Sequence, residues 1–234
     1  MRDVQALERR YYPGYVDEHA RFDAVVRGYL TPDTSLLDAG AGRGIQFPND
    51  YRDHVAHAFG VDLDPAVAEN ASLDAGVVAD LDHLPFRSDS FDLVISKYVF
   101  EHLERPLPVM RELRRSMRTG GHLLIHTPNR WHYVALGATV TPTRFHAWYN
   151  AKRGRDEVDT FRTRYRANDE STLRKLAARS GFRFVSIELI ETKPDYLLFH
   201  PLLYRTGIAY ERLVNRYDVL GRFRVQLIAD LEAT

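Results

Sequence analysis

Short apolar runs alternate with longer polar segments through the first half of the chain. Most runs end at Gly or Asp, which is typical of strands that are buried on both faces and end in tight turns. Two other segments, 16–30 and 106–118, carry their apolar residues at helical spacing. Strands that alternate with helices indicate a parallel sheet that is covered on both faces. The runs predicted as strands are 35–39, 57–62, 76–80, 91–96 and 121–127.

The pattern changes after Pro128. Residues 128–167 are rich in aromatic residues and arginine without a clean period, and we interpret them as an inserted lid. Residues 169–180 are predicted as a helix, with Asn168 as its cap and Gly181 just past its end. The rest is predicted as a strand (182–190), an apolar helical insertion (196–216) and a last strand (222–232).

A glycine-rich segment follows the first predicted strand. It runs from Asp38 to Gly44, with glycines at alternate positions. Glycines here let the backbone turn tightly and let a ligand approach it closely. The spacing differs from the dinucleotide fingerprint, and no Gly-Lys-Ser/Thr follows, so a phosphate clamp is disfavoured. Asp38 would repel a pyrophosphate but could bind a cationic ligand, and a plain turn is the alternative.

Further polar residues close the next predicted strands. Asp62 and Asp80 end the second and third strands, and Ser96 ends the fourth. Ligands of parallel α/β sheets bind outside the carboxyl ends of the strands, so these side chains mark the expected site. Each Asp alone could instead be a turn former or cap. Asp64 competes with Asp62, because it precedes Pro65 and could cap a short helix.

In these features the chain resembles the class I S-adenosylmethionine-dependent methyltransferases of the type 11-like group. The resemblance implies a Rossmann-like, mostly parallel seven-stranded sheet with helices on both faces and an antiparallel last strand. It runs almost without a break over residues 36–127, in the segments Asp38–Gly44, Gly60–Pro65, Asp80–Leu81, Leu84–Phe86, Ser90–Val94, Glu101–Leu103 and Leu113–Gly121.

One methyltransferase domain over 1–234 is therefore expected. Its predicted parts are an N-terminal helical cap (1–30), a cofactor-binding core (31–127), the lid (128–168) and a C-terminal part of the sheet with the helical insertion (169–234).

The resemblance implies S-adenosylmethionine as the cofactor and S-adenosylhomocysteine as the product. Asp62 matches the ribose-binding acid of the family, and Asp80 with Leu81 matches its adenine-contacting pair. A carboxylate at this strand end can accept both ribose hydroxyls. Leu63 and Leu81 would enclose the ring, and Asp38 would lie near the methionine amino group. The predicted cofactor-binding residues are Asp38, Gly40, Ala41, Gly42, Gly44, Asp62, Leu63, Asp80, Leu81, Ser96 and Lys97.

His102 is the candidate catalytic residue. Methyl transfer requires a positioned nucleophile and can require a base, and His102 follows the fourth strand, where the resemblance places the pocket. A capping or core histidine is the alternative. Some relatives bind a divalent metal through Asp/Glu-x-x-Glu-His, but here the first acid position is Tyr98 or Lys97, so we expect no metal.

Aromatic residues near the lid are predicted to contact the acceptor, although they would serve equally well as core under a long loop. A second aromatic stretch, 145–150, has the same two interpretations, and His126 could face the pocket or a helix. The predicted acceptor-binding residues are Tyr12, His126, Asn129, Arg130, Trp131 and His132.

Composition narrows the function further. The chain has no cysteine, which excludes disulfides, a thiolate nucleophile and Cys-ligated metal sites. Its 32 Lys+Arg and 32 Asp+Glu cancel, but residues 31–95 carry a net −9, residues 96–140 a net +4 and residues 141–185 a net +6. The basic part could bind an anionic acceptor or a membrane face, or pair with the acidic half. It includes Arg153, Arg155, Arg162, Arg164 and Arg166.

We therefore expect a cytoplasmic methyltransferase that acts on a small molecule, at a hydroxyl of a sugar, a glycan-linked compound or a secondary metabolite. The start of the chain has no signal-peptide pattern, no apolar run is long enough to cross a bilayer, and we expect no nucleic-acid partner. Residues 196–216 could contact a membrane surface or a second copy. The alternatives are a cofactor-binding regulator without turnover and an RNA or protein methyltransferase. The glycine spacing disfavours a nicotinamide oxidoreductase.

Overall fold

The computed structural model describes residues 2–44, 50–140 and 162–234. Within it the chain divides into two compact units. The sheet unit comprises Arg21–Thr127, Thr163–Glu188 and Leu227–Thr234, and the helical unit comprises Met1–Ala20, Pro128–Arg162 and Leu189–Gln226. The helical unit therefore unites parts of the predicted cap, the lid and the helical insertion. A single domain over 1–234 stays a prediction, and residues 145–150, Arg153 and Arg155 lie outside the described residues.

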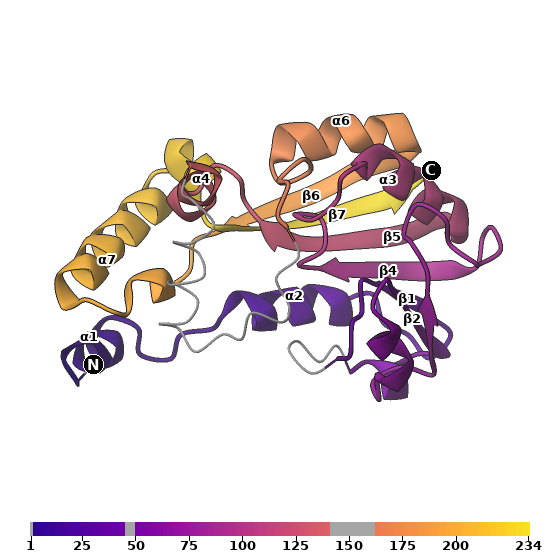
Figure 1. The fold of residues 1–234 in the computed structure, drawn as a ribbon, viewed down its shortest axis with the longest axis horizontal. Helices are drawn as coiled ribbons and strands as arrows, with labels where there is room; N and C mark the ends of the chain where they lie inside the picture. The colour runs from indigo at the N-terminus through magenta and orange to yellow at the C-terminus, as the bar shows by residue number, and fades with distance from the viewer. Residues whose placement is uncertain (1, 45–49, 141–161) are drawn as a thin grey trace. The chain divides into compact units, whose positions relative to one another are not determined.

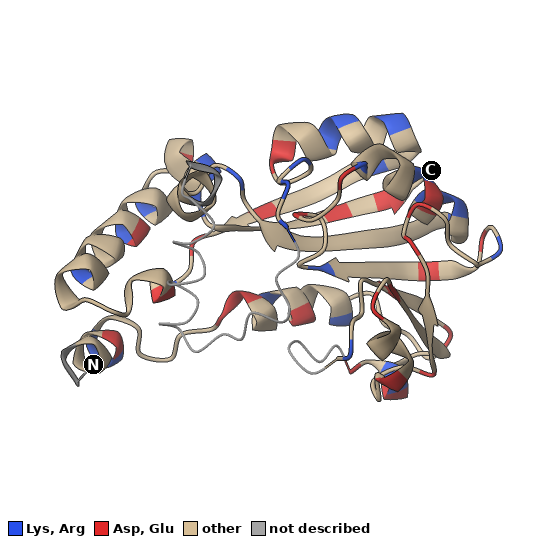
Figure 2. Ribbon diagram, in the orientation of Figure 1, with Lys and Arg blue, Asp and Glu red and all other residues tan. Residues whose placement is uncertain are grey.

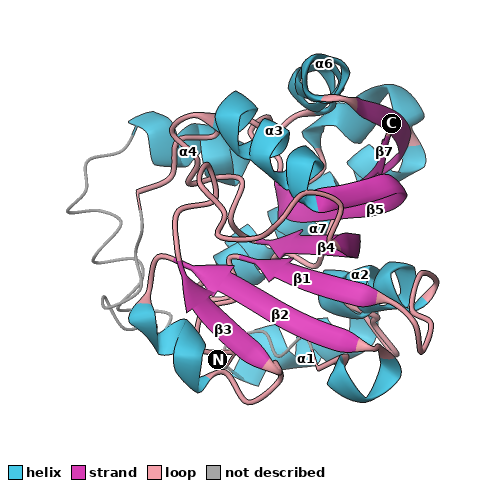
Figure 3. Ribbon diagram, turned by 90° about the vertical axis from the view of Figure 1, so that its right-hand side faces the viewer, coloured by secondary structure: helices cyan, strands magenta, loops and turns pink. Residues whose placement is uncertain are grey.

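A seven-stranded sheet is the main feature of the described structure (Figures 1 and 3). Its strands are β1 (Ser35–Ala39), β2 (His57–Asp62), β3 (Ala75–Val78), β4 (Phe91–Lys97), β5 (Met117–Pro128), β6 (Phe182–Ile190) and β7 (Gln226–Ala233). They lie in the order β3-β2-β1-β4-β5-β7-β6, and β1 to β5 pair in parallel. This arrangement confirms the predicted Rossmann-like fold.

The last strand runs against its neighbours. His122 in the middle of β5 bonds to Asp230 of β7 at 2.7 Å, and the backbone N–H of Asn129, just after β5, donates to the carbonyl of Val225, just before β7. On the other side, the N–H of Thr234, just after β7, donates to the carbonyl of Gly181, just before β6. These pairings are antiparallel, as predicted. The last strand nevertheless begins at Gln226 and not at 222 as predicted, because residues Asp218–Phe223 form a 3-10 helix, η5.

In the described part of the chain, three α-helices flank the sheet: α2 (Glu18–Arg27), α3 (Pro106–Ser116) and α6 (Glu170–Ser180). Helices α3 and α6 lie on one face and α2 lies on the other (Figure 1). The apolar stripe of α3 is buried at Val109, Met110 and Leu113, as its spacing predicts. Two 3-10 helices, η1 (Arg52–His54) and η2 (Pro65–Glu69), precede and follow β2. Helix α2 ends at Arg27, earlier than the Pro32 signal suggested.

The cap of α6 is Asp169, one residue later than predicted. Its Oδ1 accepts a hydrogen bond from the backbone N–H of Thr172 at 2.9 Å, and its Oδ2 accepts from the Thr172 hydroxyl at 2.8 Å. Asn168 is fully buried and donates its amide to Thr127. Two neighbouring polar residues satisfied the capping rule equally well, and tertiary packing decided between them. The helix closes at Gly181 with φ +80°, as predicted.

The helical unit contains α1 (Arg2–Tyr11), α4 (Tyr133–Val140) and α7 (Pro201–Arg216), with the 3-10 helices η4 (Asp195–Leu197) and η5. Helices α1 and α7 share a small core of Val4, Leu7, Tyr204 and Ile208. Among the described residues, no helix combines the length and the apolarity needed to cross a membrane.

Replacing Asp169 tests the observed cap. Asp169→Ala removes both hydrogen bonds to Thr172 and should lower the free energy of unfolding by about 1 kcal/mol in urea titrations. Asp169→Asn is the matched control, because an asparagine oxygen can still cap the helix. Equal losses in the two variants would contradict the assignment.

Candidate functional site

The glycine-rich turn follows β1 at the carboxyl edge of the sheet. The backbone N–H groups of Gly40 and Ala41 donate to the carbonyl of Val61 at 2.8 and 3.2 Å. Oδ2 of Asp62 accepts from the N–H of Gly42 at 2.9 Å. The turn is therefore fixed to the end of β2.

Asn70 supports the same turn from η2. It is 8% exposed, and its side-chain amide donates to the carbonyls of Ala41 and Gly42 at 3.3 and 3.2 Å. A Cβ on Gly44 would lie 2.4 Å from the Asn70 oxygen, and Gly44 has φ +73°, so glycine is required there. Sequence reasoning missed Asn70, because an asparagine between two strands looks like an ordinary loop residue.

The turn after β4 packs directly on the glycine-rich turn. A Cβ on Gly40 would lie 2.1 Å from a methyl group of Val99, so the missing side chain allows this close approach. The N–H of His102 donates to the carbonyl of Val99 at 2.9 Å. The contact between Val99 and Gly40 therefore places the segment that carries His102 beside the glycine-rich turn.

The surfaces around Asp62 fit a ligand with hydroxyl groups and a flat apolar ring. Oδ1 of Asp62 accepts from the N–H of Asp64 at 2.9 Å, so each carboxylate oxygen has one protein donor and can accept a second. Among the described residues, a Cβ on Gly42 would come within 4 Å of Asp62 alone, at 4.0 Å, so the described part of the chain leaves space before the turn. Leu63 is 61% exposed and offers apolar surface beside the carboxylate.

Other predicted cofactor residues have contacts within the protein. Ser96 is fully buried and donates to the carbonyl of Ala39 at 3.0 Å, and Asp38 is also buried. Leu81 is buried, whereas Asp80 is exposed and accepts from the N–H of Asp82 at 3.2 Å. The ammonium group of Lys97 lies 5.9 Å from the centre of the Phe22 ring. Cofactor contact by these residues stays a prediction.

Glu101 lies in a buried chain of hydrogen bonds that sequence reasoning did not find. Its Oε2 accepts from the Thr127 hydroxyl at 2.8 Å, and that hydroxyl oxygen accepts from the Asn168 amide at 2.7 Å. The three residues are no more than 4% exposed. Burial raises the pKa of Glu101 to about 7, and the hydrogen bond from Thr127 opposes this shift. These hydrogen bonds join the turn after β4, the end of β5 and the segment before α6.

His102 and His126 have different surroundings. The His102 side chain is 29% exposed, and its Nε2 lies 3.9 Å from Oε1 of Glu101. His126 is fully buried on β5, where its ring centre lies 5.3 Å from that of Phe22 and 4.9 Å from that of Tyr98. His126 therefore packs against α2, which was one of its two predicted placements. His102 is the more accessible of the two.

Two acceptor-binding candidates have structural partners in the helical unit. The Asn129 side chain donates to the carbonyls of Arg222 and Arg224, both at 2.8 Å. His132 is 1% exposed, and its Nε2 lies 3.4 Å from Glu191. Burial raises the pKa of Glu191, and the contact with His132 opposes that shift.

The remaining candidates of this unit are more open. Trp131 is 38% exposed, and the guanidinium groups of Arg130 and Arg222 each lie 5.4 Å from its ring centre. The hydroxyl of Tyr12 donates to Glu211 at 3.4 Å. Acceptor binding by all these residues stays a prediction.

Part of the basic lid is paired within the sheet unit. Arg164 forms an ion pair with Glu104, and Arg166 donates to the Glu104 carbonyl at 2.7 Å. The N–H groups of Arg164 and Tyr165 donate to the carbonyl of Glu101. The end of the predicted lid is therefore attached to the turn that carries His102.

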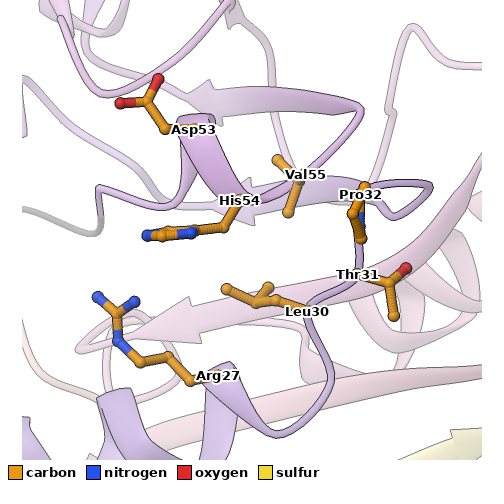
Figure 4. A pocket seen from close by; sticks show the side chains of 7 residues that line it. All are labelled: Arg27, Leu30, Thr31, Pro32, Asp53, His54 and Val55. Carbon is orange, nitrogen blue, oxygen red and sulfur yellow. The ribbon is translucent and has the colours of Figure 1, made fainter.

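A cavity of about 390 Å³ opens at the other edge of the sheet (Figure 4). It lies beside the amino ends of β1 and β2, so it is separate from the glycine-rich turn. Its lining residues are Arg27, Leu30, Thr31, Pro32, Asp53, His54 and Val55. Arg27 in this lining is bonded to Asp23 at 2.7 Å.

Known proteins match this arrangement. Residues 37–125 fit the family model described as a methyltransferase domain. The malonyl-[acyl-carrier protein] O-methyltransferase of Geobacter sulfurreducens is 31% identical over 206 residues, which cover 80% of this chain and 69% of that protein. The chain belongs to the class I S-adenosylmethionine-dependent methyltransferases.

A second curated relative and a solved structure also match the chain. A protein of Encephalitozoon cuniculi that is named as a methyltransferase is 32% identical over 141 residues, 54% of this chain and 66% of its own. The methyltransferase thus spans about two thirds of the length of these two curated relatives. A Haloferax volcanii methyltransferase, solved with the Trm112 activator, has the same fold, with a TM-score of 0.59, 21% identity and coverage of 99% of this chain and 93% of that one.

The cofactor of this family is S-adenosylmethionine. The residues of this methyltransferase fit that cofactor. The exposed side chain of Leu63 could cover its adenine ring, and the half-buried Asp62 could accept its ribose hydroxyls. The absence of a side chain at Gly42 would let the cofactor approach the backbone of the turn.

Glu101→Gln tests the buried carboxyl. Burial raises the folded-state pKa from 4.5 to about 7, so between these pH values the folded chain binds more protons than the unfolded chain. The free energy of unfolding of the wild type should therefore fall as the pH rises from 4.5 to about 7. The glutamine of the variant does not titrate, so the variant should not show this loss. Relative to wild type, the variant should gain on the order of 2 kcal/mol from about pH 5 to about pH 8 in urea unfolding.

The control is Glu69→Gln, which makes the same substitution at an exposed residue. A Glu101→Gln variant whose stability follows wild type at every pH would show that Glu101 titrates normally.

Proposed function

We propose that this methyltransferase transfers the methyl group of S-adenosylmethionine to an oxygen of a small-molecule acceptor, with His102 as the general base. The acceptor class we favour is a hydroxyl of a sugar, a glycan-linked compound or a secondary metabolite. The observation that carries the proposal is the partly exposed His102, on a turn that packs against the glycine-rich turn.

The chain's own residues have defined roles in this proposal. Asp62 accepts the ribose hydroxyls, Leu63 covers the adenine ring, and the turn at Gly42 lets the cofactor approach the backbone. When bound, the cofactor supplies an electrophilic methyl group on a sulfonium. His102 takes the acceptor's hydroxyl proton on its imidazole ring as the new oxygen–carbon bond forms and the carbon–sulfur bond breaks.

Glu101 has a positioning role beside this base. Its carboxyl group is held by Thr127 and lies within ion-pair distance of His102, so its charge bears on how readily the imidazole holds a proton. The pKa of Glu101, about 7, places this influence in the neutral pH range. The Geobacter relative, named as an O-methyltransferase, supports oxygen as the acceptor atom.

Asp62→Asn tests the ribose contact. The amide loses an acceptor oxygen, so cofactor affinity should fall about tenfold by calorimetry, which corresponds to about 1.4 kcal/mol. Asp64→Asn is the matched control, because Asp64 caps η2 through the N–H of Ala66 and should leave affinity unchanged. Equal affinities of wild type and Asp62→Asn would remove Asp62 from the ribose site.

His102→Ala tests the base. Metabolite extracts incubated with a labelled methyl donor identify an acceptor, and turnover on it should then fall about a hundredfold in the variant, with cofactor affinity preserved. His54→Ala is the control, because His54 is exposed at the opposite edge of the sheet. Full activity of His102→Ala, without a change in its pH profile, would show that positioning alone suffices. Cofactor binding without any labelled product would favour the non-catalytic regulator.

A further inference from the structure

Helix α7 buries only one of its sides in the helical unit. Tyr204, Gly207, Ile208 and Val214 are its buried residues, and Tyr204 and Ile208 pack on Val4 and Leu7 of α1. This contact accounts for the inner face. It leaves the opposite face of a 16-residue helix in contact with solvent.

A mostly apolar stripe runs along that outer face. Leu202 is 62% exposed and Leu213 is 49% exposed, and Thr206 and Ala209 between them are also exposed. Their spacing of i, i+4, i+7 and i+11 aligns the four side chains in one stripe. Further exposed apolar residues flank the stripe at both helix ends. The residues of this α7 ridge are Leu198, Phe199, Leu202, Leu203, Thr206, Ala209, Leu213, Tyr217 and Val219.

A row of arginines accompanies the ridge. Arg205, Arg212 and Arg216 recur at i, i+7 and i+11, so they form a second stripe beside the first. All three are exposed. Figure 2 shows the basic positions of α7 in blue. Glu211 is the single acid of α7, and its carboxylate accepts from Asn215 at 2.6 Å and from Tyr12. The charge presented along the ridge is therefore positive.

Leucines with a parallel row of arginines match the requirements of a helix that lies in the surface of an anionic membrane. There the apolar side chains enter the boundary between headgroups and acyl chains, and the guanidinium groups bind lipid phosphates. Two copies that met ridge to ridge would bring like-charged arginine rows to one interface, which disfavours self-association. We propose that the α7 ridge docks the helical unit on an anionic lipid bilayer, independently of the methyl-transfer reaction.

Sedimentation of the full chain with vesicles tests this proposal. The wild type should bind vesicles of equal parts phosphatidylglycerol and phosphatidylcholine, bind pure phosphatidylcholine much more weakly, and dissociate as salt is added. The double variant Leu202→Gln/Leu213→Gln should lose about tenfold or more in vesicle affinity. Replacing Arg205, Arg212 and Arg216 by Gln should abolish the preference for the anionic vesicles.

The matched control is Val78→Gln/Val185→Gln, which replaces two exposed apolar residues of the sheet unit and should bind like wild type. Circular dichroism verifies that each variant is folded. A wild type that does not bind anionic vesicles, or that binds neutral ones equally well, overturns the proposal, as does a Leu202/Leu213 variant that binds like wild type. Self-association that light scattering detects and this double variant abolishes, without vesicle binding, would assign the ridge to a second copy.

Discussion

Asp62 holds the glycine-rich turn against the end of β2, and the candidate site is arranged around this contact. A tight turn leaves backbone N–H groups that must find acceptors, and Asp62 accepts from Gly42 while Val61 accepts from Gly40. Asn70 satisfies the turn's carbonyl groups from the other side. These hydrogen bonds hold the turn in one shape, and in the proposed function this preformed surface receives the cofactor. Such preorganisation lowers the cost of binding.

Buried polar groups fix each unit in a specific arrangement. Burying a carboxyl group costs free energy unless hydrogen bonds compensate, and Glu101 is compensated by Thr127, which Asn168 supports in turn. The helical unit contains a comparable pair, in which Glu191 faces His132 and accepts from the N–H of Val225 at 2.8 Å. Burial raises the pKa of both carboxyl groups. Each set of contacts joins segments that are distant in sequence. A change in packing would therefore leave a buried polar group without its hydrogen-bond partner.

The charged residues of the chain sum to zero, but they have different structural roles. Several acids at the strand ends accept backbone hydrogen bonds, as Asp62, Asp64 and Asp80 do. Some arginines of the predicted lid are paired internally, since Arg164 and Arg166 both bond to Glu104. The arginines of α7 instead accompany an exposed apolar stripe. Charge sums over sequence windows cannot separate these cases, because pairing depends on contacts between distant segments.

The sequence by itself determined the parallel strands of the sheet, the helices α2, α3 and α6 that flank them, and the family, and it predicts a site at the carboxyl edge of the sheet. Local spacing is enough for these features, because buried strands, glycine turns and strand-end acids each require particular residue types at particular positions. Tertiary structure alone decided that Asp169 and not Asn168 caps α6, that Asn70 supports the glycine-rich turn, and that Glu101 is buried. It also decided which face of α7 is exposed, since its apolar residues occur on both faces. These outcomes depend on which partners the fold brings together, and sequence spacing does not encode that.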